Sequence, residues 1–297
     1  MSILDAIIQG IVQGLTEFLP ISSDGHLTLV QHFTGKSAEG AALFTILLHL
    51  GTLMSVFVMF RTTISKLIAE FFEMMKDIFT KKFTFKAMND YRRMIFLILF
   101  TLIPLLLFYF VKDYFKALAE DDDILVEGIL FIVTGIMLYF ADRIYPGNKT
   151  AADMGLGDAL LVGTAQGFAA LPGISRSGST ISTMILRGYD KEFTITFSFL
   201  MGIPAILGAN IVEVGEALSN DVKIDFLPAI VGIIVSFLVG LVAIRFLRWI
   251  VESDRLNIFS YYTIFLGCVV IVIAMVERVV GMSVYDMISG ILPFFDR

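Results

Sequence analysis

Two short polar runs carry the residues of this chain that are best suited to chemistry. The first, residues 13–26, reads QGLTEFLPISSDGH and places a glutamate, two neighbouring serines, an aspartate and a histidine inside an apolar region. The second, residues 171–180, reads LPGISRSGST and places an arginine among serines and glycines. Charged and unpaired polar groups are costly inside a membrane. We therefore expect the two runs to form one site, which the remaining segments hold together.

Two of the titratable groups in the first run have distinct uses. An ionisable residue within a membrane indicates a functional site by default, although Glu17 could also be a structural partner for Arg176, and the two roles are compatible. Glu17 could act as a base or hold a divalent cation, because Mg²⁺ needs one or two carboxylates together with substrate phosphates. His26 titrates near neutral pH and can exchange a proton with a serine or a water molecule. His49, in the middle of an apolar segment, could line the same cavity.

The second run is suited to binding phosphate. Arg176 can hold a phosphate through two parallel hydrogen bonds. Neighbouring hydroxyl groups add donors, and glycines let backbone amides approach an anion. The residues that we expect to bind substrate are Ser22, Gly25, Gly173, Ser175, Ser177, Gly178 and Thr180. Together with Glu17, Ser23 and His26 they suit phosphoryl chemistry, in which catalysis is mainly positioning and charge neutralisation.

The composition predicts an integral membrane protein. Of the 297 residues, 57% are hydrophobic and 17% are charged, whereas about a quarter of a soluble domain is charged. The mean hydropathy is +0.84. The net charge of -6 describes mainly the loops, and no basic stripe with interleaved aromatic residues suggests a nucleic-acid partner. The amino-terminal segment shows no sign of a cleaved signal peptide, so we expect the first embedded segment to direct insertion into the bilayer.

Apolar segments long enough to span a membrane recur along the chain. They are residues 43–60, 94–111, 124–141, 193–214, 226–249 and 257–276. Residues 3–33 and 158–186 are apolar but interrupted by the polar runs, and each predicts a re-entrant hairpin of two short helices. Residues 64–79 predict an interfacial amphipathic helix. The acidic residues 120–123 predict a solvated loop on the outer side.

The two polar runs are related by an internal repeat. An offset of 153 residues aligns Gly10 with Gly163, Gln13 with Gln166 and Ser22 with Ser175. We predict an all-α integral membrane protein forming a single domain over residues 1–297. Repeat one covers about residues 1–145 and repeat two about 155–280, each a re-entrant hairpin plus three transmembrane helices. Basic residues after the first span place that loop in the cytoplasm, so the repeats are inverted and their helix N-termini point at a common anion.

The two runs resemble those of a known family, the undecaprenyl-diphosphate phosphatases of bacteria, also called bacitracin-resistance proteins. The resemblance extends to LHLGTL at residues 48–53 and FSFLMGIP at residues 197–204. It implies a multi-pass enzyme of the bacterial inner (plasma) membrane whose active site opens to the outer side. The implied reaction removes the terminal phosphate of a C55 polyprenyl diphosphate. It releases inorganic phosphate and the monophosphate carrier for cell-wall synthesis.

The resemblance also implies site residues and a cofactor. The family needs a divalent cation, here Mg²⁺ or Ca²⁺, and its pattern matches Glu17 and Gln13 as metal ligands. The catalytic positions of its motifs match Glu17, Ser23, His26 and Arg176. Many members have glutamate at the position of Gln13 and threonine at the position of Asp24. Asp24 could be a cation ligand or a helix-capping residue, and the resemblance is compatible with a homodimer.

Some alternatives stay open at this point. Ser23 or a water molecule could attack the terminal phosphorus, so the sequence does not choose between a phosphoserine intermediate and direct hydrolysis. A polyprenyl-phosphate flippase or secondary transporter is the alternative function, because inverted repeats with broken helices are common in transporters. Glu17, His26 and Arg176 together favour an enzyme. A phosphatidic-acid-type phosphatase is set aside, because its motif needs a histidine downstream of the serine–arginine pair and none follows Arg176.

Overall fold

The computed structural model describes residues 2–34, 41–84, 88–111, 123–145, 147–219 and 225–291. In these ranges the regular structure is helical, apart from an isolated bridge between Lys149 and Tyr189. The helices of the first half are α1 (Ile3–Thr16), α2 (Ser23–Thr34), α3 (Ala41–Met59), α4 (Arg61–Phe79), α5 (Asp90–Tyr109) and α7 (Leu125–Asp142). Those of the second half are α8 (Leu156–Phe168), α9 (Arg176–Leu186), α10 (Lys191–Ser219), α11 (Phe226–Glu252), α12 (Asn257–Val280) and α13 (Val284–Ile291). The predicted all-α class is confirmed.

The described ranges contain 5 helices long and apolar enough to cross a membrane, which are α5, α7, α10, α11 and α12. Helices α3 and α4 pass the same test together, but they are bent by 85° at a break between them. Each predicted span therefore corresponds to a helix, and the multi-pass membrane class is confirmed. Helix α4 is the helix predicted over residues 64–79, and its interfacial position stays a prediction.

The predicted acidic loop falls largely outside the described residues. Residues 120–122 are not among those described, whereas Asp123 precedes α7 and forms an ion pair with Arg278 of α12. That ion pair ties the start of one predicted span to the end of another.

Each polar run forms a turn between two short helices, as predicted. Pro20 and Pro172 interrupt the apolar runs, since proline cannot continue a helix without losing a hydrogen bond. Ser22 (φ 70°) and Gly173 (φ 102°) adopt the left-handed conformation that reverses the chain in each turn. Ser175 then caps α9, because its hydroxyl accepts a hydrogen bond from the amide of the third helical residue at 3.0 Å. The sequence thus folds locally into the hairpins α1–α2 and α8–α9.

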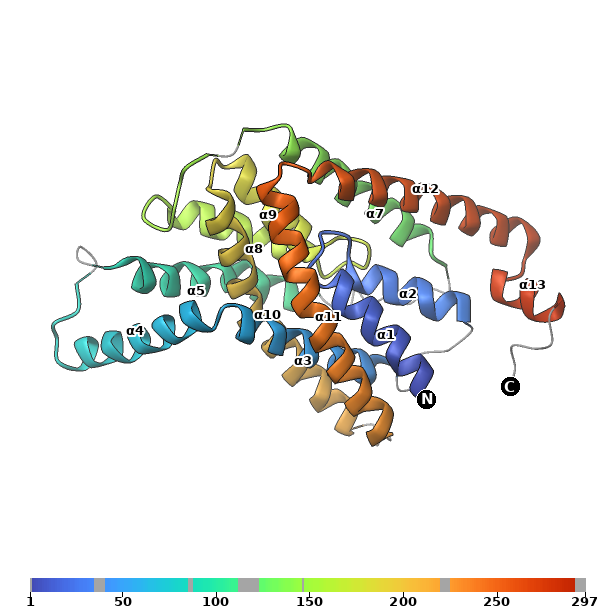
Figure 1. Ribbon diagram of the computed structural model, residues 1–297, viewed down its shortest axis with the longest axis horizontal. Coiled ribbons are helices and arrows are strands. Elements are labelled where there is room, and N and C mark those ends of the chain that lie inside the picture. The colour runs from blue at the N-terminus through green and yellow to red at the C-terminus, as the bar shows by residue number, and fades with distance from the viewer. Residues whose placement is uncertain are drawn as a thin grey trace.

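Each hairpin packs against a long helix of the other half of the chain. Helix α1 packs on α11 and α8 packs on α5, while α7 and α12 lie side by side (Figure 1). Small residues permit this close approach. A Cβ at Gly14 would lie 2.8 Å from the Ser236 carbonyl oxygen, and one at Gly163 would overlap the carbonyl oxygen of Thr101. Each hairpin thus contacts a helix of the opposite half, which is the arrangement that a two-fold relation between the halves would give. The inverted topology and the repeat boundaries stay predictions.

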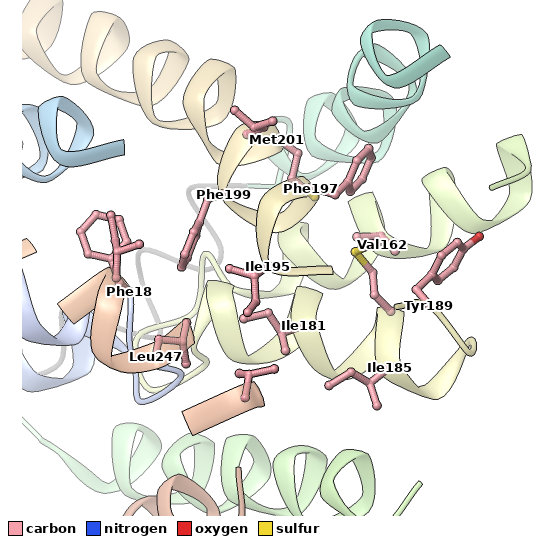
Figure 2. Close-up of a cluster of buried hydrophobic side chains, with 14 of the residues drawn as sticks. Phe18, Val162, Ile181, Ile185, Tyr189, Ile195, Phe197, Phe199, Met201 and Leu247 are labelled. Atoms are coloured by element: carbon pink, nitrogen blue, oxygen red, sulfur yellow. The ribbon is translucent and has the colours of Figure 1, made fainter. Parts of the chain in front are cut away.

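A buried apolar cluster fixes the first turn (Figure 2). Phe18 is fully buried and meets Phe199 of α10 edge to face, with ring centroids 5.4 Å apart. Ile181 of α9 and Leu247 of α11 belong to the same cluster. Edge-to-face aromatic pairs are worth about 0.5–1.5 kcal/mol beyond the area they bury. Because Phe18 directly follows Glu17, its packing also holds the glutamate in place.

Candidate active site

The turns of the two hairpins meet at Ser22. Its hydroxyl accepts hydrogen bonds from the amides of Gly25 at 3.3 Å and Gly173 at 3.0 Å. A Cβ at Gly25 would lie 2.9 Å from the Gly173 nitrogen, so the turns touch backbone to backbone. Thr134 of α7 secures the second turn, donating to the Gly173 carbonyl oxygen at 2.9 Å and accepting from the Ser175 amide at 3.1 Å. The two polar runs therefore lie together in space.

Glu17 lies at the centre of the contacts between the runs, and it is 6% exposed. Its Oε1 accepts a hydrogen bond from Nη2 of Arg176 at 2.5 Å. Its Oε2 accepts from Ser23 Oγ at 2.9 Å and from Gln13 Nε2 at 3.0 Å. Ser23 and Arg176 are the first residues of α2 and α9. The carboxylate thus contacts the side chains of the first residues of two helices, whose N-terminal ends favour an anion.

Gly202 on α10 leaves the space that the guanidinium group of Arg176 occupies. A Cβ at Gly202 would overlap Nη1 of Arg176, so any other residue would displace the guanidinium. Nη1 is buried and has no hydrogen-bond partner among the described residues. A buried donor without a partner is costly, whereas a phosphate could accept from it in the paired geometry that arginine favours. Gly202 lies in the FSFLMGIP segment, but the sequence alone gave it no role.

His49 of α3 joins the same group of residues. Its Nε2 lies 3.5 Å from Oε2 of Glu17 and 3.8 Å from Oδ1 of Asp24. Its Nδ1 lies 2.9 Å from the carbonyl oxygen of Thr45. A carbonyl oxygen only accepts, so we assign a proton to Nδ1. The roles of His49 and Asp24 were open from the sequence, and the structure places both beside Glu17.

His26 begins in the same turn but has other partners. Its Nδ1 lies 2.7 Å from the Ser22 carbonyl oxygen, and its Nε2 lies 2.7 Å from the hydroxyl of Tyr262 on α12. Among the described residues, the imidazole therefore hydrogen-bonds to Ser22 and Tyr262, and not to Ser23 or Glu17. A catalytic role for His26 has to be compatible with this orientation.

The hydroxyl groups of the second run form internal hydrogen bonds. Ser175 caps α9, Ser177 donates to the carbonyl oxygen of Leu19 at 3.2 Å, and the Thr180 hydroxyl lies 2.6 Å from that of Ser198. All three side chains are buried. They brace the second turn against the first turn and against α10. Their contact with substrate stays a prediction.

The residues around Glu17 suit a hard divalent cation. The described ranges contain no group of three or more His, Cys, Asp or Glu side chains arranged to hold a metal ion. Mg²⁺, however, is usually bound through one or two carboxylates together with substrate phosphates and water. Oε1 of Gln13 is buried beside Glu17 and accepts no hydrogen bond within the described part of the chain. This amide oxygen and the carboxylate are the kind of oxygen ligands that such a cation prefers.

The fold and the site define a class of protein. It is a multi-pass membrane protein in which two helical hairpins meet around a buried acid–arginine pair with adjacent hydroxyl groups. A family model described as bacitracin resistance protein BacA matches residues 6–269. The chain belongs to this family, as the resemblance of its two polar runs indicated.

Curated relatives match almost the whole chain. A protein of Alkaliphilus metalliredigens named undecaprenyl-diphosphatase is 42% identical over 279 residues, which cover 93% of this chain and 100% of that protein. Proteins of Carboxydothermus hydrogenoformans and Halothermothrix orenii carry the same name. They are 39% and 37% identical, over 92% of this chain in both cases and 98% and 99% of those proteins. The family model, over residues 6–269, covers the whole second hairpin and all but the first residues of the first.

Proposed function

We propose that this chain is an undecaprenyl-diphosphatase of the bacterial inner membrane. It hydrolyses the terminal phosphate of a C55 polyprenyl diphosphate, producing polyprenyl phosphate and inorganic phosphate. Family membership and the names of the relatives support this reaction. The structural observation that carries it is the contact of Glu17 with both Ser23 and Arg176, which brings an acid, a nucleophile and a phosphate-binding group together.

In this proposal, the second hairpin supplies most of the phosphate binding. Arg176 donates to the diphosphate through the buried Nη1, and Gly202 keeps space for its guanidinium. The N-termini of α2 and α9 add backbone dipoles that favour negative charge at the junction. Positioning and charge neutralisation account for most of the catalysis of phosphoryl transfer.

The nucleophile is Ser23 or a water molecule in its place. Ser23 Oγ donates to Glu17 Oε2 at 2.9 Å, so Glu17 is placed to take the proton as the oxygen attacks the terminal phosphorus. A new phosphorus–oxygen bond forms while the bond to the bridging oxygen breaks, and polyprenyl phosphate leaves. Attack by water gives inorganic phosphate directly, whereas attack by Ser23 gives a phosphoserine that a water molecule then hydrolyses to release the phosphate. His26 is a second group that can exchange a proton, and its Nε2 faces the hydroxyl of Tyr262 instead of Ser23. A rapid-quench search for labelled phosphoserine decides between the two nucleophiles.

We further propose that Glu17 and Oε1 of Gln13 hold a divalent cation, Mg²⁺ or Ca²⁺. When bound, such an ion neutralises charge on the diphosphate. The contribution of the chain is to present a carboxylate and an unpaired amide oxygen at the junction of the hairpins. Asp24 and His49 then act as neighbours that tune the charge of Glu17.

The lipid chain of the substrate lies along apolar surfaces of the spans in this proposal. A wholly apolar cavity of about 500 Å³ is bounded by α3, α4, α5 and α10. Ile203 and Pro204 line it, and they directly follow in the chain the glycine that packs on Arg176. From the family resemblance we propose that the site opens to the outer side, and the basic residues after α3 favour the cytoplasm for the loop that holds them. The proposal is compatible with a homodimer.

Phosphate release from undecaprenyl diphosphate by purified protein in detergent tests the proposed function. With Mg²⁺ or Ca²⁺ present, we expect inorganic phosphate and undecaprenyl phosphate in equal amounts. A folded protein that releases no phosphate with either cation would instead indicate a flippase or a transporter. A chelator should stop the reaction and added cation should restore it.

A further inference from the structure

We infer that Tyr262 is a positioning residue that holds His26 ready for proton exchange. The inference rests on the proposed phosphatase function and on a role for His26 in it. Tyr262 belongs to neither polar run, since it lies in α12, 236 positions along the chain from His26. It would extend the site from the two hairpins to a third part of the fold.

The hydrogen bonds of His26 determine its tautomer. Nδ1 faces the carbonyl oxygen of Ser22 at 2.7 Å, and a carbonyl oxygen can only accept. The proton of the neutral ring therefore lies on Nδ1, and the lone pair lies on Nε2. Nε2 is 2.7 Å from the hydroxyl of Tyr262, so the hydroxyl donates to it. Ser22 and Tyr262 together select the tautomer whose basic nitrogen points toward α12.

Two aromatic rings hold the plane of the imidazole. The ring of Tyr262 lies parallel to it, with an interplanar angle of 9° and centroids 5.7 Å apart. Phe131 of α7 meets it edge to face, with centroids 5.1 Å apart and an angle of 81°. Phe131 is fully buried, and its Cζ would lie 2.7 Å from a Cβ at Gly25. The orientation of the imidazole is thereby tied to the turn where the hairpins meet.

The hydrogen bond between Tyr262 and Nε2 of His26 can form whether or not His26 is protonated. A phenolic hydroxyl both donates and accepts hydrogen bonds. It donates to Nε2 of the neutral ring and can accept from Nε2–H of the imidazolium. Tyr262 can therefore keep the ring in place while His26 gains or loses a proton. A phenylalanine would preserve the stacking but lose this hydrogen bond.

A purely space-filling role fits Tyr262 less well. Its side chain belongs to a residue that is 41% exposed, so it is not enclosed by the core. Its neighbour Tyr261 is 59% exposed and makes no hydrogen bond to His26. The hydroxyl–imidazole contact thus distinguishes the two tyrosines. Tyr261 provides a matched control on the same helix.

The test compares Tyr262→Phe with Tyr261→Phe in steady-state phosphate release from undecaprenyl diphosphate. We expect kcat of Tyr262→Phe to fall at least about tenfold, because general acid–base catalysis contributes about 10²- to 10⁴-fold. KM should change less than about twofold, and Tyr261→Phe should match the unsubstituted protein. The melting temperature in detergent should be nearly unchanged, because the ring and its stacking are preserved.

A double variant then shows whether Tyr262 acts through His26. We expect His26→Gln combined with Tyr262→Phe to be no slower than His26→Gln alone, because the hydroxyl has no imidazole left to position. Wild-type kcat for Tyr262→Phe, or losses that multiply in the double variant, would overturn the inference. Full activity of His26→Gln would also overturn it. Absence of phosphate release by the unsubstituted protein would instead reject the proposed function itself.

Discussion

Glu17 of the first hairpin and Arg176 of the second form an ion pair across the junction of the two turns, with Oε1 and Nη2 2.5 Å apart. The side chains are only 4% and 16% exposed. Breaking a buried ion pair by removing one partner leaves an uncompensated charge and costs about 3–5 kcal/mol. The pair therefore links the hairpins and presents an acid and an arginine at the same place. Conservative variants that preserve the size of each side chain are needed to separate these two roles.

Gly202→Ala should impair the site through Arg176. The added methyl group would displace Nη1 of Arg176 and disturb its contact with Glu17. We expect kcat for phosphate release to fall at least about tenfold, since one well-placed electrostatic donor is worth about 10²- to 10³-fold. Gly208→Ala on the same helix is the control, because no atom lies within 4 Å of a Cβ there. Equal activity of the two variants would contradict the role given to Gly202.

Gly173→Ala should weaken the fold at the second turn. Gly173 has φ 102°, and a Cβ there would lie 2.8 Å from the carbonyl oxygen of Glu127. Backbone strain of this kind costs about 1–3 kcal/mol, so we expect a lower melting temperature in detergent. Gly157→Ala in α8 is the matched control, because nothing lies within 4 Å of its Cβ. A melting temperature that changes equally in both variants would show that the turn tolerates a side chain.

His49→Gln should lower phosphate release while leaving the protein folded. The imidazole lies beside the carboxylates of Glu17 and Asp24, so its replacement changes the polar surroundings of the base. We expect a loss of roughly tenfold in kcat, equivalent to about 1.4 kcal/mol. His32→Gln serves as a control, because His32 pairs with Glu277 at 2.9 Å instead of with site residues. If both variants kept the full rate, His49 would be a structural residue.

Tyr189→Phe should destabilise the second hairpin in a pH-dependent way. The Tyr189 hydroxyl donates to Asp158 at 2.6 Å, and Arg187 pairs with the same carboxylate at 2.7 Å. Burial alone would raise the pKa of Asp158, but the contacts with Tyr189 and Arg187 outweigh it and hold the pKa below its ordinary value of 3.8. The carboxylate thus adds stability above that pH, which is lost as the pH falls through the lowered pKa.

The measurement for this hairpin is thermal unfolding in detergent at several pH values. At neutral pH we expect the free energy of unfolding of Tyr189→Phe to be lower by about 1–3 kcal/mol, because the Asp158 carboxylate loses the hydroxyl that donates to it. The difference from the unsubstituted protein should shrink as the pH falls below 3.8. Tyr145→Phe is the control, because Tyr145 is 95% exposed. A difference that stays constant with pH would contradict the role of Asp158.

The fold was largely predictable from the sequence, because a membrane leaves few structures open to a long apolar segment. The segment predicted at residues 226–249 is α11, and the one predicted at 257–276 is α12. The hairpins were predictable for a related reason. A proline and a cluster of polar residues within an apolar run require a turn that other parts of the protein cover.

The contacts around the site were only partly predictable. The sequence paired Glu17 with Arg176, because two isolated charges in apolar surroundings favour each other. It did not identify Gly202, Tyr262 or the partner of His49. Helices that are apolar on all sides give no periodic signal of the face turned toward a neighbour. Which side of α10, α12 or α3 faces the hairpins therefore depends on the packing of the complete fold.

The central claim is that Glu17 and Arg176, brought together from the two hairpins, form the phosphatase site. The most direct measurement is phosphate release from undecaprenyl diphosphate by Glu17→Gln, Arg176→Gln and the double variant, each checked for folding. We predict that each single variant loses at least about 10²-fold in rate and that the double variant is no slower than the slower single one. A folded single variant that retains the wild-type rate would contradict the claim.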